Sequence, residues 1–215
     1  RLRKEAAERL HADRMAFIRS HRQSPLALYV ANEMISKSFS VPATDLEEIL
    51  ARNCRISDTA RAARFCRQAE QACYFCKDIH YPDVPLHTPT FDTTLLSAHI
   101  RPGHVTLIDC WASWCGPCRA AIPKVKALYD KYGRDRFDVI SISLDSKKED
   151  WQKALEEEKM PWPQFIAGNR GYKQLTSRYN ISSIPNLILI DGKGQVVCNT
   201  FSPEEIRIEL EQILR

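Results

Sequence analysis

Two cysteines separated by two residues, Cys115 and Cys118, are the side chains best suited to chemistry. Thiol–disulfide exchange needs a thiolate that attacks a disulfide and a second thiol that releases the mixed disulfide. A cysteine at the start of a helix meets the first need, because unpaired N–H groups and the helix dipole favour its charged form. The second cysteine, one turn later, is within reach. We therefore predict Cys115 as the nucleophile and Cys118 as the resolving thiol.

Gly116 and Pro117 separate the two cysteines. Glycine removes side-chain bulk, and proline is tolerated at a helix start because its missing N–H is not needed there. A zinc half-site is the alternative interpretation of the pair, but zinc needs a second pair of Cys or His ligands. The nearest candidates, Cys73 and Cys76, fall in a helical stripe, so we predict neither a metal nor a cofactor.

The elements that position this pair follow from hydrophobic periodicity. Residues 1–77 are expected to form an all-helical domain, and residues 78–90, which contain three prolines, a linker and entry segment. Within the helical part, Ser24-Pro25 and Thr44-Asp45-Leu46-Glu47 are typical helix starts. A fourth helix is expected from Ser57 or Asp58 to about Lys77.

The second half alternates strand and helix. Strands are expected at Val105–Trp111, Phe137–Leu144, Leu187–Ile190 and Gln195–Cys198, and helices at 116–132, 147–159, 171–179 and from Ser202-Pro203 onward. This order predicts an α/β fold with a mixed sheet and helices on both faces.

The stretch from Leu107 to Arg119, which reads LIDCWASWCGPCR, resembles the active-site segment of thioredoxins. Pro123 matches the family's kinking proline, and Tyr179 to Asp191 is similar to its cis-proline segment. The resemblance covers roughly residues 85–215 and is closest to the TlpA/ResA-like envelope thiol-disulfide oxidoreductases. The features that suggest this group are the Pro-rich entry from Pro85 to Phe91, Ser143-Leu144-Asp145 before Trp151, and Pro161-Trp162-Pro163. It implies a thioredoxin-like fold after the helical domain.

The resemblance also implies a cis peptide bond between Ile184 and Pro185. The Ile184 backbone would then lie beside the two sulfurs and pair with an extended substrate segment, as in strand addition. The alternative is an ordinary trans proline at the first residue of a strand.

Asp109 lies six residues before Cys115, inside an apolar strand pattern. The resemblance makes it the buried acid beneath the dithiol. We expect burial to raise its pKa so that it takes the proton from Cys118 during resolution. The alternative is a strand-end aspartate that accepts a hydrogen bond from a backbone N–H. The ResA-like branch often has glutamate three residues after the second cysteine, where this chain has Ala121.

Three further residues surround the site. We expect Trp114 to shield the sulfurs and offer apolar contact to a partner, and Trp111 to lie in the core. Arg119 either senses charge on a partner or is a solvated helix residue. The substrate-binding candidates are therefore Trp114, Gly116, Pro117, Ile184 and Pro185.

The remaining cysteines and the histidines receive structural interpretations. Cysteine often behaves as a small buried apolar residue, which is our expectation for Cys54, Cys66, Cys73, Cys76, Cys110 and Cys198. For the pair Cys73 and Cys76, a redox role is the alternative. The six histidines show no metal-like spacing, and we expect them on the surface or in the linker.

Composition limits the partners. The net charge of +4 is scattered along the 215 residues and gives no indication of nucleic-acid binding. The apolar run Leu187–Ile190, like the other apolar runs of the chain, is far too short to span a membrane. Because the chain begins at Arg1 rather than Met, any anchoring is expected only through a missing N-terminal segment. The expected location is the bacterial periplasm or cell envelope, with the cytoplasm as the alternative.

The sequence thus predicts an enzyme that exchanges disulfides with protein substrates, as a reductant recharged by an upstream thiol donor. A thiol peroxidase of the peroxiredoxin-like class and a partner-binding module with a redox switch are the alternatives. The first would need a single cysteine in a Pro/Thr-containing loop, which we do not find. The second would place the main activity in the helical half.

Overall fold

The computed structural model describes residues 2–21, 24–35, 41–53, 65, 66, 69, 79–133 and 136–214. These residues divide into two compact units, Arg1–Ile79 and His80–Arg215. Each unit has its own buried core, and we describe each by itself.

The first unit contains three described helices: α1 (Leu2–Ser20), α2 (Pro25–Ile35) and α3 (Ala43–Asn53). Their apolar faces meet in a core that also includes Phe65 and Ala69. Arg19 of α1 forms an ion pair with Glu48 of α3 at 2.7 Å. The expected fourth helix lies outside the described residues except at 65, 66 and 69.

The two helix starts expected in this unit have different outcomes. Ser24 caps α2 as predicted, because its Oγ accepts a hydrogen bond from the Leu26 N–H at 3.2 Å. The predicted start, with Thr44 as the N-cap, comes two residues too late, whereas the predicted end near Asn53 is confirmed. Helix α3 already begins at Ala43, and the N–H groups of Asp45 and Leu46 donate to the carbonyl of Pro42 instead.

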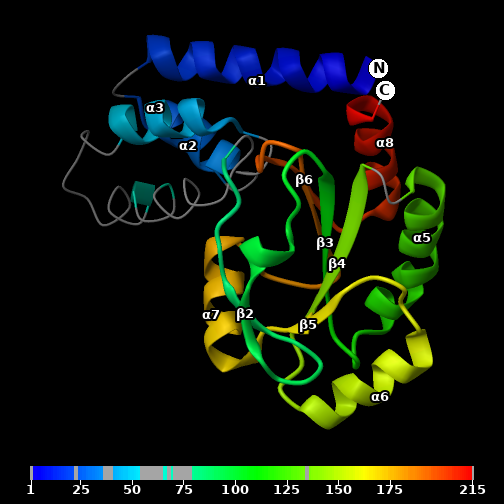
Figure 1. Ribbon diagram of the computed structural model, residues 1–215. Coiled ribbons are helices and arrows are strands. Elements are labelled where there is room, and N and C mark those ends of the chain that lie inside the picture. Colours follow the sequence, from blue (N-terminus) through cyan, green and yellow to red (C-terminus); the bar gives the residue numbers. More distant parts are fainter. Residues whose placement is uncertain are drawn as a thin grey trace. The chain divides into compact units, whose positions relative to one another are not determined.

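The second unit is built on a seven-stranded sheet in the order β2-β1-β5-β4-β3-β6-β7 (Figure 1). Strands β3, β4 and β5 are parallel to one another, and β6 is antiparallel to β3. The strands are β1 (Pro85–His87), β2 (Thr93–Leu95), β3 (Val105–Trp111), β4 (Phe137–Ser143), β5 (Gln164–Ile166), β6 (Asn186–Ile190) and β7 (Val196–Thr200).

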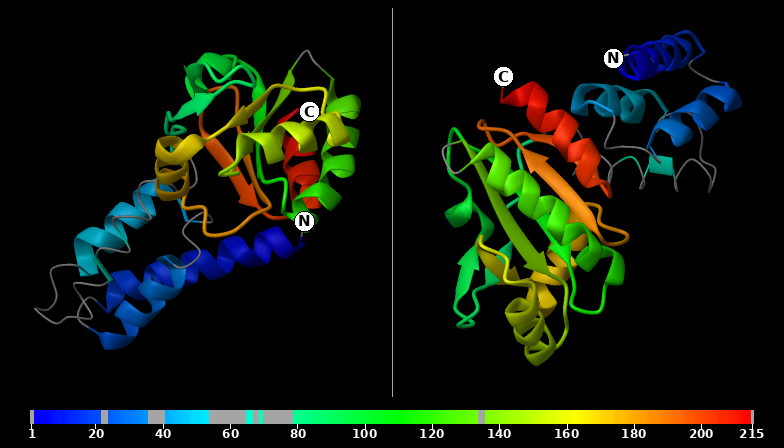
Figure 2. Two further views of the ribbon diagram at one scale, coloured as in Figure 1. Left: turned by 90° about the horizontal axis from the view of Figure 1, so that it is seen from below. Right: turned by 90° about the vertical axis from the view of Figure 1, so that its right-hand side faces the viewer.

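Helices cover both faces of this sheet. Helices α5 (Gly116–Tyr132) and α8 (Pro203–Ile213) lie on one face, and α7 (Gly168–Arg178) lies on the other (Figure 2). Helix α6 (Lys148–Glu158) is joined to α5 by ion pairs from Arg119 to Glu157 and Glu158. The expected mixed α/β sheet with helices on both faces is confirmed. Because every residue of β3 is buried, β3 is a rigid central support for the loop and helix α5 that come after it.

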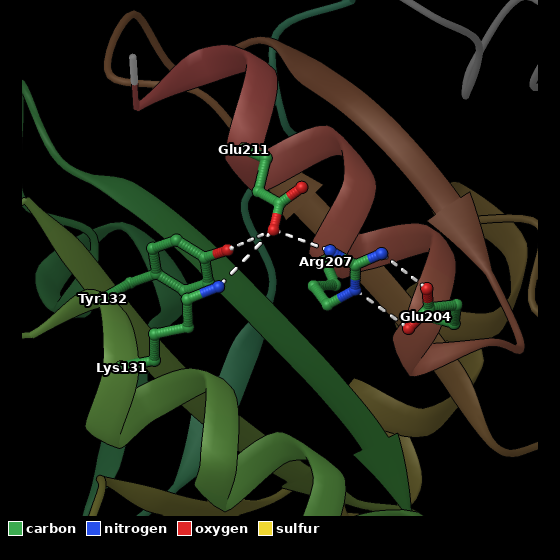
Figure 3. A network of polar contacts seen from close by, with 5 residues as sticks. All are labelled: Lys131, Tyr132, Glu204, Arg207 and Glu211. Atoms are coloured by element: carbon green, nitrogen blue, oxygen red, sulfur yellow. Dashed lines mark hydrogen bonds and ion pairs between the residues drawn. The ribbon is translucent and has the colours of Figure 1, made fainter. Parts of the chain in front are cut away.

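A polar network joins the C-terminal ends of α5 and α8 (Figure 3). Glu211 of α8 accepts a hydrogen bond from the Tyr132 hydroxyl at 3.3 Å and pairs with Arg207 at 2.6 Å. Lys131 of α5 approaches the same carboxylate at 3.4 Å. This network fixes the end of α5 that is remote from the cysteines.

Some elements differ from the sequence expectation. The stretch expected to be a linker contains β1, which pairs with both β2 and β5. Strand β5, which directly follows Pro163, is absent from the sequence prediction. Ser202 precedes α8 as predicted, but its side chain makes no capping hydrogen bond.

Candidate active site

Cys115 occupies the N-cap position of α5, directly after the loop that leaves β3. Its Sγ accepts a hydrogen bond from the Cys118 N–H at 3.2 Å. That N–H is one of the donors that a helix start leaves without an intrahelical partner, and Pro117 before it has none to offer. The helix start therefore directs a backbone donor at the sulfur predicted to be the nucleophile.

Cys115 and Cys118 form a disulfide, with 5.2 Å between their Cα atoms. The exposed fractions are only 5% for Cys115 and 2% for Cys118. The pair belongs to an apolar cluster with Trp111, Ile122 and Trp151. The two sulfurs are thus brought together at the edge of the core, where one can attack a partner and the other displace it.

The residues around Cys115 are open to solvent. Trp114 is 70% exposed, and Gly116 and Pro117 are also exposed. A Cβ added to Gly116 would meet no atom within 4 Å. The surface above the disulfide therefore leaves room for another chain, and the exposure of Trp114 favours its contact role over its shielding role.

Ile184 and Pro185 come from the segment between α7 and β6. Their peptide bond is cis, and Ile184 packs against the apolar cluster that contains both cysteines. The neighbouring Ser182 and Ser183 are exposed. The structure thus brings the Ile184 segment, which comes much later in the sequence, to the cysteine pair.

Asp109 lies within β3 and is 4% exposed. Burial raises its pKa to about 6, and a hydrogen bond from Ser141 opposes part of that rise. The Ser141 hydroxyl donates to Asp109 Oδ2 at 2.9 Å from the adjacent strand β4. The expected burial is observed, and the partner is a side chain rather than a strand-end N–H.

Sequence reasoning missed Ser141 and its neighbours. The Trp162 indole N–H donates to Ser141 Oγ at 2.8 Å, and Met160 Sδ lies 3.8 Å from the same oxygen. Met160 in turn packs against the cluster that holds the disulfide. A signal was present in the sequence, because a serine within the apolar run Phe137–Ser143 is a buried hydroxyl that needs partners.

The loop between β3 and α5 is fixed by Asp145, which sequence reasoning also missed. Its carboxylate accepts hydrogen bonds from the Ser113 N–H at 2.9 Å, the Ser113 hydroxyl at 2.7 Å and the Ser143 hydroxyl at 2.7 Å. The Leu144 N–H donates to the Trp111 carbonyl at 2.8 Å. These bonds hold the residue two positions before Cys115 against the end of β4.

Two residues near the site take structural roles. Trp111 is fully buried, as expected. Arg119 is a partly exposed residue of α5 that pairs with Glu158 at 2.6 Å and Glu157 at 2.7 Å, and its sensing of charge on a partner stays a prediction. Its charge links α5 to α6.

The other cysteines are distributed between the two units. Cys110 and Cys198 are buried, as expected, and burial raises the pKa of the Cys110 thiol well above its ordinary value. Cys66 packs against the helical core but is disulfide-bonded, so its interpretation as a purely apolar packing residue is wrong. The predictions for Cys54, Cys73 and Cys76 fall outside the described residues.

Two histidines are more enclosed than expected. The His99 ring lies 4.3 Å from that of Phe165, and the side chain of His104 is 20% exposed beside Asp138. Within the described ranges, no group of three or more His, Cys, Asp or Glu side chains could hold a metal ion. The helices in that part of the chain include none that is long and apolar enough to cross a membrane.

Comparison with known proteins agrees with this geometry. Residues 103–196 match a family model described as thioredoxin-like. The chain is 26% identical over 133 residues to thiol-disulfide oxidoreductase ResA of Geobacillus kaustophilus, covering 58% of this chain and 75% of ResA. For sporulation thiol-disulfide oxidoreductase A of Bacillus subtilis the identity is 25%, covering 47% of this chain and 61% of the relative.

Solved structures of thiol-disulfide exchange proteins resemble this chain as well. A thiol:disulfide interchange protein DsbE from Chlorobium tepidum is 32% identical, with a TM-score of 0.53 covering 65% of this chain and 96% of that one. The thioredoxin domain of a Bacteroides vulgatus thiol-disulfide oxidoreductase shares the fold, with 24% identity and a TM-score of 0.59 covering 65% of this chain and 98% of that one.

A mixed sheet whose central strand leads into a Cys-Gly-Pro-Cys helix start defines a thioredoxin-like protein. The chain belongs to the thioredoxin-like family, among the thiol-disulfide oxidoreductases related to ResA.

Proposed function

We propose that this chain reduces disulfides in protein substrates through Cys115 and Cys118. The observation that carries the proposal is the pair's placement, with Cys115 at the N-cap of α5 and the Cys118 N–H directed at its sulfur. A sulfur in this position is stabilised as the thiolate, because the donor and the helix dipole both favour negative charge.

In the first step the Cys115 thiolate attacks one sulfur of a substrate disulfide. A bond forms between Cys115 Sγ and that sulfur, the substrate disulfide breaks, and the other substrate sulfur leaves as a thiolate that takes a proton from solvent. The open surface at Gly116 and Trp114 supports this step, because a substrate chain must approach Cys115 closely.

In the second step Cys118 releases the substrate. Asp109 takes the proton of the Cys118 thiol, and the resulting thiolate attacks Cys115 Sγ. The mixed disulfide breaks, and the second substrate sulfur leaves as a thiolate that takes a proton from solvent. Asp109 returns its proton to solvent, and the enzyme is left with the Cys115–Cys118 disulfide. An upstream dithiol then restores the reduced pair by the same exchange.

The substrate is proposed to lie along two segments of the site. Trp114, Gly116 and Pro117 provide one exposed side. The backbone at Ile184 and Pro185 provides the other and would pair with an extended peptide. The reductant direction is supported by the Cys-Gly-Pro-Cys sequence, which resembles that of reducing thioredoxins.

Reduction of insulin disulfides by the reduced protein tests the activity. We expect turnover by the wild type, none by Cys115→Ser, and a trapped mixed disulfide with Cys118→Ser. Cys198→Ser is the matched control, because it removes a buried sulfur on β7, and it should keep the activity. Absence of turnover by the wild type would contradict the proposal.

Equilibration of the dithiol with glutathione tests the direction of electron flow. A reductant is expected to stay largely oxidised in buffers where an oxidase of the DsbA type is already reduced. A potential in the range of such strong oxidants would contradict the reductant role and leave the exchange chemistry intact.

We also propose a location in the bacterial envelope. Cys66 in the helical unit is disulfide-bonded, and non-catalytic disulfides persist mainly in oxidising compartments. Labelling of the native protein in intact cells with a membrane-impermeant maleimide, after reduction, checks this location. Labelling only after lysis would contradict it.

A further inference from the structure

The Pro161–Pro163 segment is linked to the buried acid Asp109 through Ser141, a residue that the proposed reaction does not use. The Ser141 N–H donates to the Pro163 carbonyl at 3.1 Å, and the Trp162 indole donates to Ser141 Oγ at 2.8 Å. Trp162 is buried, and its ring lies 5.4 Å from that of Tyr129. The segment is thus held firmly over Ser141.

The Trp162 indole limits which further hydrogen bonds the Ser141 hydroxyl can form. An indole N–H only donates, so it occupies one of the two lone pairs of Ser141 Oγ. The single hydroxyl hydrogen and the second lone pair remain. They face Asp109 Oδ2 at 2.9 Å and Met160 Sδ at 3.8 Å.

The hydroxyl hydrogen and the second lone pair of Ser141 allow it to form a hydrogen bond with Asp109 in either protonation state. When the carboxylate is charged, the hydroxyl hydrogen donates to it. When Asp109 is protonated, its own O–H donates to the second lone pair, and the hydroxyl hydrogen rotates toward the Met160 sulfur, a weak acceptor. The acid therefore keeps a hydrogen-bond partner while it gains and loses a proton.

We propose that Ser141 is a positioning residue that partners Asp109 in both protonation states, with Trp162 fixing the direction of its hydroxyl. This inference rests on the proposed function, in which Asp109 takes the proton of Cys118. It assigns a role to Trp162 and Ser141 that requires no contact between them and substrate.

The groups around Asp109 allow a change in its titration midpoint to be assigned to Ser141. From its own strand, Cys110 contributes a thiol that stays protonated at neutral pH, because burial raises its pKa. Strand β6 places the apolar Leu187 beside Asp109. Cys115 and Cys118 lie in the cluster that Met160 packs against, and they do not titrate while they form a disulfide.

The test is an NMR titration of the Asp109 carboxyl carbon in the oxidised protein. We expect a wild-type midpoint near 6. Ser141→Ala removes the partner of both forms. Because the hydrogen bond to the charged carboxylate is the stronger of the two, its loss should raise the midpoint by about one pH unit. Ser141→Thr keeps the hydroxyl and should restore it, and Trp162→Phe should raise it by a smaller amount.

Thr106→Val is the matched control. It removes a buried hydroxyl from the same strand as Asp109, and this hydroxyl has no hydrogen-bond partner among the described residues. Its Asp109 midpoint should equal that of the wild type. A Ser141→Ala midpoint within about 0.2 of the wild type, far below the change expected for a lost charged hydrogen bond, would overturn the inference. Should Ser141→Ala not fold, an unchanged midpoint in Trp162→Phe would overturn the role of the indole.

The pH profile of mixed-disulfide resolution separates the two proposals. In reduced Ser141→Ala its acidic limb should move upward with the Asp109 midpoint, because only charged Asp109 accepts the proton. A shifted midpoint with an unshifted limb supports the Ser141 contact and contradicts the proton-accepting role of Asp109.

Discussion

Asp109 is held in a state that works against the stability of the fold. Burial raises its pKa to about 6 from an ordinary value near 3.8, so the folded protein binds a proton that the unfolded chain has already released between these two pH values. The free energy of unfolding therefore falls as the pH rises through this interval. A buried acid with this cost is typical of a site where a proton must be moved near neutral pH.

Asp109→Asn should consequently stabilise the protein at pH 7.5 by about 1–3 kcal/mol. The gain should be much smaller at pH 4, because there the folded carboxyl is protonated and the unfolded one has released only about half of its proton, so little of the cost of ionising the buried group remains. Urea unfolding of the oxidised proteins at the two pH values measures the difference. Cys110→Ala is the control, and its effect should be the same at both pH values because that thiol stays protonated. An Asp109→Asn effect independent of pH would contradict the raised pKa.

At the residue scale, local sequence identifies some site residues and not others. Cys115, Cys118 and Asp109 are recognisable because their types and spacing are unusual within an apolar strand and a helix start. Ser141 and Asp145 act through strand register and loop contacts across more than thirty positions of sequence. No short-range pattern specifies such a pairing, although the polar residues within the β4 run indicate that partners must exist.

At the scale of elements, the loop between β3 and α5 determines where the nucleophile lies. Asp145 binds both the N–H and the hydroxyl of Ser113, and Ser143 donates to the same carboxylate. The loop is therefore fixed to the end of β4 before α5 begins at Gly116.

Asp145→Ala should lower the free energy of unfolding by about 2–4 kcal/mol, because it leaves buried donors without a charged acceptor. Insulin reduction should fall as well, since the loop before Cys115 loses its attachment. Chemical denaturation and the insulin assay measure the two effects. The exposed Asp150→Ala, on α6, should change both far less. Equal effects of the two substitutions would contradict the role given to Asp145.

Long elements were predictable and very short ones were not. The bounds of β3 agree with the sequence prediction because apolar or β-branched residues fill the strand between turn residues, with Asp109 as the one exception. Strands β1, β2 and β5 have three residues each and lie beside prolines or polar turns, so periodicity has too few positions to act on. Their pairing depends on the sheet that they join.

At the scale of the whole molecule, the chemistry is concentrated in one unit. Every residue of the proposed site, its supporting strands and its apolar cluster lie within His80–Arg215. The helical unit has a separate core, built from residues of α1 to α3 together with Phe65 and Ala69. The function of that unit is not required to explain disulfide exchange.

Residues 80–215 alone should therefore fold and reduce insulin at a rate within about twofold of the full chain, because the domain buries its own core. Circular dichroism and the insulin assay check this expectation. A folded fragment without activity would contradict the assignment of the site to one unit and favour a helical unit that takes part in substrate binding.

The central claim is that the start of α5 stabilises Cys115 as a thiolate. The most direct measurement is the pH dependence of iodoacetamide alkylation at Cys115 in the reduced protein, read by peptide mass spectrometry. We predict a midpoint at or below about 7.5, under the ordinary thiol value of about 8.5. A midpoint at or above the ordinary value, or alkylation at Cys118 before Cys115, would contradict it.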